Sequence, residues 1–217
     1  MTGSAEAGNR NNVAAQLSIT AAHNSTGMVR LWAYARAFLV RRRTFLGMVV
    51  AFALLLVADP RLPSLVAGAV LMAGAHTLRL VSSGYLNKDE ALVTRGPFAW
   101  CRNPLYLGNF LVSVGFVAMS GQWAALPLVL LLCTATQVPT VTCEEQFLRE
   151  KFGQRFEQYC RRVPRWLPRI PRRPDESNEL QAQEPGFSWA RVLSNQEHLN
   201  IISAWLMAAM FIVEMVK

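Results

Sequence analysis

Residues 96–119 read GPFAWCRNPLYLGNFLVSVGFVAM, a polar and aromatic start that runs directly into an apolar block. Gly96 and Pro97 are typical of a turn. Pro104 suits the first turn of a helix, and Asn103 before it suits the N-cap. The stretch therefore predicts a helix that begins at a polar entrance and continues in an apolar environment.

Apolar residues gather in blocks rather than at the spacing of a soluble core. They make up 52% of the 217 residues, against 17% charged residues. A membrane-spanning helix needs about 20 mostly apolar residues. We therefore predict an all-α integral membrane protein with about five transmembrane helices. The five blocks are residues 44–58, 65–81, 105–119, 123–141 and 199–216.

The positive charges are distributed unevenly between the two sides of these blocks. Of the 22 Lys and Arg residues, 20 fall on one side, and only Arg61 and Lys217 fall on the other. Cytoplasmic segments of membrane proteins carry such an excess. We expect the N-terminus and the long polar connections to be cytoplasmic, and membrane lipids to be partners. The net charge of +8 is accompanied by no nucleic-acid-binding motif, so nucleic acid is not an expected partner.

The remaining segments complete the predicted organisation. Residues 1–27 are small and polar with no apolar signal region, which indicates a disordered tail and no secretory signal. Residues 28–170 form the predicted membrane core. Residues 171–198 read as a polar linker and an interfacial helix, and residues 199–217 as the fifth transmembrane helix. The four cysteines lie far from metal-ligand spacing, so no metal site is expected.

Two further features of the core are candidates for function. In residues 143–169, apolar side chains recur every three or four positions, which predicts an amphipathic helix on the membrane surface. Glu144 and Glu145 lie where the fourth block ends. Acids at membrane depth are functional candidates because burying them is costly. His76, in the second block, is expected to be hydrogen-bonded within the helix bundle.

The motifs together resemble a known family. ALVTRGPFAWCRNPLYLG at residues 91–108, followed by EExxLxxxFGxxFxxYxxxVP at residues 144–164, is similar to the isoprenylcysteine carboxyl methyltransferases. These belong to a wider group of membrane methyltransferases that includes the phospholipid N-methyltransferases. The resemblance covers roughly residues 76–169. It implies a cofactor site formed by the cytoplasmic connecting segments.

The resemblance implies S-adenosylmethionine as the cofactor and a prenylated or lipid molecule as the acceptor. Helix N-terminal amides suit the methionine carboxylate, and Glu144 suits a cationic group. The implied cofactor-binding residues are Glu90, Ala91, Leu92, Val93, Phe98, Arg102, Asn103, Pro104, Leu105, Tyr106 and Glu144.

Two positions depart from the family pattern. Asn103 stands where the family has His, and Thr140 stands where the prenylcysteine enzymes have an Arg that contacts the substrate. Arg162 is a candidate to replace that Arg as the counter-ion of a carboxylate. Glu145 is the candidate proton acceptor if the acceptor is an ammonium lipid. Glu145 and Arg162 are therefore the two predicted catalytic residues.

The predicted function is methyl transfer from S-adenosylmethionine to a lipophilic acceptor at the cytoplasmic membrane face, like that of isoprenylcysteine carboxyl O-methyltransferases. A phospholipid amine N-methyltransferase is one alternative. Another is an NADPH-dependent membrane sterol or enone reductase, although such reductases have Asn where this chain has Leu105. A non-catalytic membrane scaffold is the third alternative.

Overall fold

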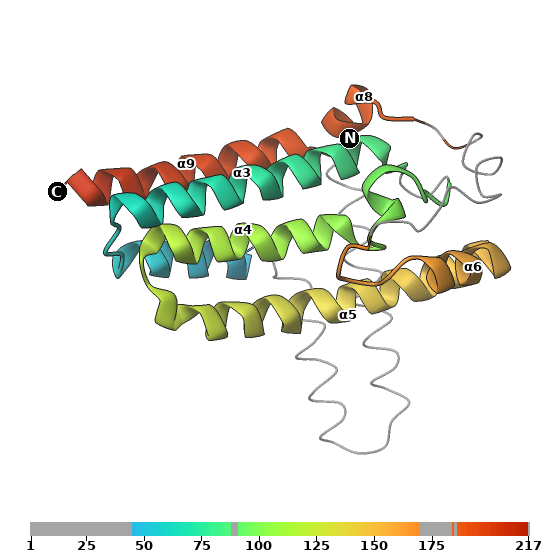
Figure 1. The fold of residues 1–217 in the computed structure, drawn as a ribbon, viewed down its shortest axis with the longest axis horizontal. Helices are drawn as coiled ribbons and strands as arrows, with labels where there is room; N and C mark the ends of the chain where they lie inside the picture. Colours follow the sequence, from blue (N-terminus) through green and yellow to red (C-terminus); the bar gives the residue numbers. More distant parts are fainter. Residues whose placement is uncertain (1–44, 88–90, 170–183, 185, 217) are drawn as a thin grey trace, which may run out of the picture.

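The computed structural model describes residues 45–87, 91–169, 184 and 186–216, and within them the fold is all-helical (Figure 1). An unlabelled helix, Phe45–Leu56, precedes α3 (Leu62–Tyr85). α4 (Pro104–Ser120) and α5 (Leu126–Phe152) follow, and α6 (Gln154–Arg162) extends beyond α5. The chain continues through α8 (Trp189–Ser194) and α9 (Glu197–Val216). Short 3-10 turns, η1 (Gly96–Ala99) and η2 (Trp123–Ala125), precede α4 and α5.

Within the described ranges, three helices are long and apolar enough to cross a membrane: Leu62–Tyr85, Trp123–Phe152 and Glu197–Val216. Phe45–Leu56 and Pro104–Ser120 are apolar but shorter. At 1.5 Å per residue α4 is about 25 Å long, slightly less than a hydrocarbon core of about 30 Å. The predicted all-α membrane fold is confirmed, whereas the number of five spans stays a prediction. The predicted tail at residues 1–27 lies outside the described residues.

α3 and α4 form the most extensive contact of the bundle and lie side by side (Figure 1). Glycines permit this close approach. A Cβ atom on Gly115 would lie 2.5 Å from Met72 Cγ, and one on Gly68 would lie 2.6 Å from the Gly115 carbonyl oxygen. Small residues let membrane helices pack closely in this way. The contact fixes α4, and therefore the polar entrance at its start, against α3.

The turn after α4 is also set by a glycine. Gly121 ends α4 with φ of 73°, the left-handed conformation that glycine adopts without strain. A Cβ there would lie 2.4 Å from the Asp59 carbonyl oxygen. The Asp59 N–H donates to the Ser120 carbonyl at 3.0 Å, so the two loops at this end of the bundle are joined.

The region after the fourth apolar block differs from the prediction. α5 continues without interruption through Glu144 and Glu145 to Phe152. The helix ends at Gly153, whose φ is 52°. Only α6 is a separate helix. Its buried Phe156 and Tyr159 form an apolar cluster with Leu92 and Val163. The amphipathic face therefore holds the connecting segments together at the polar end of the bundle.

Candidate active site

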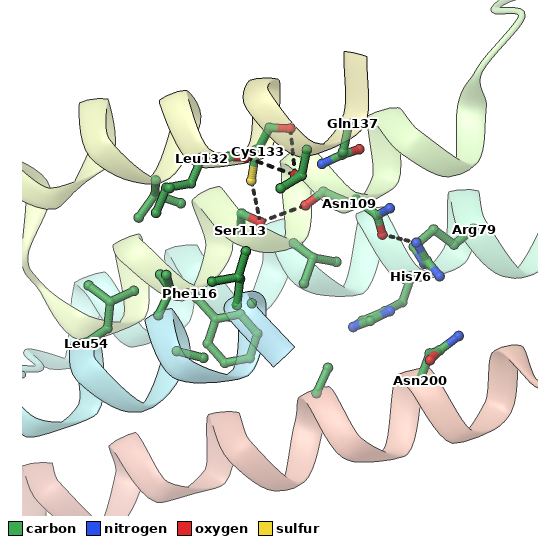
Figure 2. A pocket seen from close by; sticks show the side chains of 18 residues that line it. Leu54, His76, Arg79, Asn109, Ser113, Phe116, Leu132, Cys133, Gln137 and Asn200 are labelled. Atoms are coloured by element: carbon green, nitrogen blue, oxygen red, sulfur yellow. Dashed lines mark hydrogen bonds between the residues drawn. The ribbon is translucent and has the colours of Figure 1, made fainter. Parts of the chain in front are cut away.

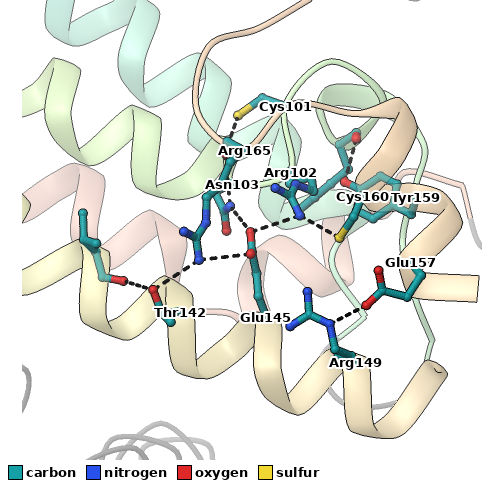
Figure 3. Close-up of polar contacts among 12 residues, drawn as sticks. Cys101, Arg102, Asn103, Thr142, Glu145, Arg149, Glu157, Tyr159, Cys160 and Arg165 are labelled. Carbon is teal, nitrogen blue, oxygen red and sulfur yellow. Dashed lines mark hydrogen bonds and ion pairs between the residues drawn. The ribbon is translucent and has the colours of Figure 1, made fainter. Parts of the chain in front are cut away.

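The polar entrance and the end of α5 meet through Asn103 and Glu145, which are 42 positions apart in the sequence (Figure 3). The Asn103 Nδ2 amide donates to Glu145 Oε1 at 3.1 Å and to the Arg165 carbonyl at 3.1 Å. Both side chains are buried, each with 7% exposed. Asn103 occupies the predicted N-cap position, but its side chain makes no cap hydrogen bond. The reason is that its amide is turned toward Glu145 instead.

Two arginines approach the same carboxylate from different segments. Arg102 Nη1 lies 3.6 Å from Glu145 Oε1, and Arg165 Nη2 lies 3.1 Å from Glu145 Oε2. The Nε atoms of Arg102 and Arg165 are buried and have no hydrogen-bond partner among the described residues. Two guanidinium groups face one carboxylate, so this cluster has an excess of positive charge and N–H donors to offer an anion.

Tyr106 and Glu144 form a second contact between the same two helices. The Tyr106 hydroxyl donates to Glu144 Oε2 at 3.0 Å. Tyr106 lies in the first turn of α4, and Glu144 lies next to Glu145 on α5. A second carboxylate is thus held beside the cluster, where it can accept hydrogen bonds from a cationic group.

The segment after α6 returns along the polar entrance. The Arg102 N–H donates to the Pro164 carbonyl at 2.9 Å, and the Arg169 N–H donates to the Trp100 carbonyl at 3.0 Å. The Cys101 thiol lies 3.1 Å from the Trp166 carbonyl oxygen, to which it can donate. Burial raises the pKa of Cys101, so the thiol stays protonated. These contacts bring Arg165 to Glu145.

The residues before the turn are held by α6 and by a distant glutamate. The Tyr159 hydroxyl donates to the Phe98 carbonyl at 2.8 Å, and burial raises the pKa of Tyr159. Glu184 accepts hydrogen bonds from the Thr94 N–H at 2.8 Å and from the Thr94 hydroxyl at 2.9 Å. Leu92, Val93 and Phe98 are buried here. The segment that the resemblance assigns to the cofactor is therefore packed against the helices that carry the polar cluster.

Most of the predicted site residues lie at this end of the bundle. Asn103, Arg102 and Glu145 are in one cluster, and Tyr106 and Glu144 are in direct contact. Pro104 occupies the start of α4, and the Leu105 carbonyl accepts from Arg79 Nη1 at 3.3 Å. Ala91 is half-buried. Glu90 lies outside the described residues.

Arg162 is placed differently from the other predicted residues. It is exposed in the last turn of α6, whereas Arg165, three positions later, contacts Glu145. Sequence reasoning missed Arg165 and Glu184. Arg165 directly follows the V-P that ends the family-like pattern, which was a usable signal. Glu184 lies in the polar linker and carried none.

Comparisons with known proteins show which families this part of the chain is similar to. The sequence profile of the phospholipid methyltransferase family matches residues 65–155, which run from α3 to the start of α6. That segment is therefore similar to the phospholipid methyltransferase family. No solved structure is significantly similar to the chain.

Two curated relatives share the name protein-S-isoprenylcysteine O-methyltransferase. The chain is 35% identical over 103 residues to a protein-S-isoprenylcysteine O-methyltransferase of Schizosaccharomyces pombe, covering 48% of this chain and 43% of the relative. It is 31% identical over 102 residues to a protein of the same name from Tribolium castaneum, covering 47% and 36%. The resemblance to this family is confirmed.

A third relative, with a different name, is similar to this chain over a shorter stretch. The cobalt-zinc-cadmium resistance protein CzcN of Cupriavidus metallidurans is 40% identical over 84 residues, covering 38% of each chain. The chain thus spans less than half the length of each of these relatives. Among the residues that the structure describes, no three His, Cys, Asp or Glu side chains gather as a metal site would require.

Proposed function

We propose that the protein transfers a methyl group from S-adenosylmethionine to a lipophilic acceptor. The observation that carries the proposal is the buried cluster of Asn103 and Glu145. It joins the two motifs of the family-like pattern, and the matched domain includes both. The comparison with methyltransferases supports the reaction class, and the polar cluster supports a site for a charged cofactor.

The side chains at this end of the bundle fit the charges of S-adenosylmethionine. The buried Nε–H groups of Arg102 and Arg165 can donate to the methionine carboxylate. Glu144, held by Tyr106, can accept from the amino group. Leu92 and Phe98 offer apolar surface nearby. When bound, the cofactor supplies a methyl group that its sulfonium already makes electrophilic.

The protein's part in such a reaction is mainly to position the reactants. Correct orientation of two reactants contributes about 7–11 kcal/mol. Glu145 fixes Asn103, Arg102 and Arg165 at once, so we assign it a positioning role. As a proton acceptor it would have to give up an ion pair, because both of its oxygens are engaged. Arg165 contacts Glu145 and Arg162 is exposed, so Arg165 is the better candidate to bind a carboxylate.

The location of the site relative to the membrane follows from the charge distribution. The cluster lies at the start of α4 and near the end of α5, and the connections on this side carry the excess of Lys and Arg in the sequence. We therefore place the N-terminus and the active site on the cytoplasmic side. An acceptor dissolved in the bilayer could then approach between the helices while the cofactor binds from the cytoplasm.

Two acceptor classes have support. The names of two relatives favour the carboxylate of a prenylated cysteine, and the description of the matched family favours a phospholipid amine. A carboxylate needs no proton acceptor, which agrees with the engaged state of Glu145. We therefore rank the carboxylate first and the amine second.

The test is transfer of a labelled methyl group in proteoliposomes. Purified protein is given labelled S-adenosylmethionine and either a farnesylated cysteine or phosphatidylethanolamine, and the label in the lipid phase is counted. Glu144→Gln should reduce transfer at least tenfold. Glu150→Gln, on the exposed face of α5, is the matched control and should retain it. No transfer to either acceptor, together with a response to NADPH, would favour the reductase alternative instead.

A further inference from the structure

A cavity of about 310 Å³ lies between the helices of the bundle (Figure 2). Its lining includes none of the residues of the charged cluster, which are Arg102, Asn103, Glu145 and Arg165. It is lined by α3, α4, α5, α9 and the helix Phe45–Leu56. One part of the wall is apolar and includes Leu54, Phe116 and Leu132. The other part is polar and includes His76 and Gln137 (Figure 2). The cavity therefore has the two-sided character of a site for an amphiphile.

The polar wall contains hydrogen-bonding atoms that the described protein does not satisfy. His76 and Gln137 are each 6% exposed. Neither ring nitrogen of His76 has a partner within the described part of the chain, and the same holds for Gln137 Oε1. His76 was expected to be hydrogen-bonded within the bundle, and the structure instead places its ring beside Trp205, with 6.2 Å between ring centroids. Unpaired polar groups inside a membrane bundle are costly and are usually retained for function.

The charge in the cavity wall is already balanced. Arg79 donates from Nε to Glu197 Oε1 at 2.7 Å, and it also contacts the side-chain oxygen of Asn109. The Arg79 and Glu197 side chains are only 12% and 5% exposed. A ligand carboxylate would therefore gain little from Arg79, so the wall favours a neutral ligand. Gln137 Oε1 accepts and cannot donate, which requires a donor such as a hydroxyl on the ligand.

The polar wall of the cavity lies one to two helical turns from the candidate active site along α4 and α5. Gln137 lies seven residues before Glu144 on α5, which is two helical turns, or about 10 Å. Asn109 lies three residues after Tyr106 on α4, which is about one turn. The polar wall thus faces the end of the bundle where Tyr106 meets Glu144, and the apolar wall lies deeper.

We propose that this cavity binds a neutral, hydroxyl-bearing lipophilic molecule, with its hydroxyl groups at His76 and Gln137 and its apolar skeleton against Leu54 and Phe116. The proposal goes beyond the proposed function, because it gives this cavity a neutral ligand that is distinct from the carboxylate and amine acceptors considered above. A plain hydrocarbon chain would leave both polar side chains unpaired.

The test uses tritiated farnesol bound to the detergent-purified full chain and measured by scintillation proximity. Competitors are unlabelled farnesol, farnesyl methyl ether, which lacks the donor, and farnesoic acid, which is charged. We expect farnesol to compete at least tenfold better than either analogue. His76→Leu and Gln137→Leu should each abolish this preference. Thr77→Val, which removes an exposed hydroxyl bonded only to its own helix, is the matched control and should retain it.

Melting temperatures and S-adenosylmethionine binding distinguish failure of this proposal from failure of the proposed function. Without ligand, both Leu variants should melt at the same or a higher temperature, because an unsatisfied polar group is removed. A large decrease in both melting temperatures would overturn the proposal by showing internal partners. Equal competition by alcohol and ether, or no farnesol binding, as in a cavity that holds only water, would also overturn it. S-adenosylmethionine binding is measured in parallel: its absence would remove the proposed function, while the farnesol result alone decides the ligand class of the cavity.

Discussion

Two polar regions lie about 12 Å apart along α5 and differ in how their hydrogen bonds are satisfied. Around Glu145 the carboxylate is engaged by Asn103, Arg102 and Arg165. In the bundle cavity, His76 and Gln137 present atoms without partners in the described structure. The carboxylate of the first region is fully engaged, and the atoms left unpaired there are the cationic Nε–H groups of Arg102 and Arg165. The second region leaves an imidazole and an amide oxygen unpaired among the described residues.

Removal of Glu145 should break the first region and produce the largest effect. Glu145→Ala leaves the guanidinium groups of Arg102 and Arg165, whose side chains are 15% and 33% exposed, without their carboxylate. Loss of one partner of a buried ion pair costs about 3–5 kcal/mol. We expect the free energy of unfolding, measured by denaturant titration in detergent, to fall by that amount. Glu150→Ala on the exposed face should change it by less than about 0.5 kcal/mol. Equal effects of the two changes would contradict the positioning role of Glu145.

A second change should make the cavity positively charged, as the region around Glu145 is. Glu197→Gln removes the charge that balances Arg79, at a cost of about 3 kcal/mol in the free energy of unfolding. The uncompensated guanidinium should then favour an anion. In the competition assay, farnesoic acid should become a better competitor than farnesol. If the order of competitors is unchanged, charge balance does not determine the selectivity of the cavity.

Tyr106→Phe tests the contact that lies between the two regions. The change removes the hydroxyl that donates to Glu144, and one such hydrogen bond contributes about 1 kcal/mol. We expect a small loss of stability and roughly a fivefold weaker binding of S-adenosylmethionine, measured by calorimetry, if the bond is worth about 1 kcal/mol. An unchanged dissociation constant would mean that Tyr106 does not help to position Glu144 for the cofactor.

The smallest expected effect concerns the Cys101 thiol behind the charged cluster. Burial raises the pKa of Cys101, so its stabilising effect is complete below the pKa of the unfolded thiol and is lost as the pH rises toward the folded value. Iodoacetamide at pH 8 should therefore modify Cys101 slowly in the folded protein and rapidly after denaturation, as followed by mass spectrometry. Equal rates in both states would show that the segment beside Cys101 opens readily.

Much of the bundle could be predicted because its signals are local. The apolar blocks at residues 65–81, 105–119 and 123–141 lie within α3, α4 and the η2–α5 helix, since long apolar runs leave few alternatives to a membrane helix. Asn103 and Glu145 were both in the predicted set, because each belongs to a dense motif. Their direct contact could not be derived from spacing within either motif.

The remaining features depend on contacts between distant segments. Arg165 reaches Glu145 because residues 164 and 169 form backbone hydrogen bonds with residues 102 and 100, and such bonds have no sequence periodicity. Arg162 was the residue proposed from the sequence, but the orientation of the last turn of α6 leaves it exposed. Glu184 comes from a linker whose composition predicted only polarity. The unpaired state of His76 likewise depends on what the other helices place opposite it.

Calorimetric titration of the detergent-purified chain with S-adenosylmethionine tests the central claim most directly. A variant that combines Asn103→Ala and Glu144→Ala is titrated beside it, and the folding of both proteins is checked by thermal denaturation. We predict saturable binding to the native protein and its loss in the folded variant. Absence of binding to the folded native protein, or equal binding to both, would contradict the assignment of the charged cluster as the methyl-donor site.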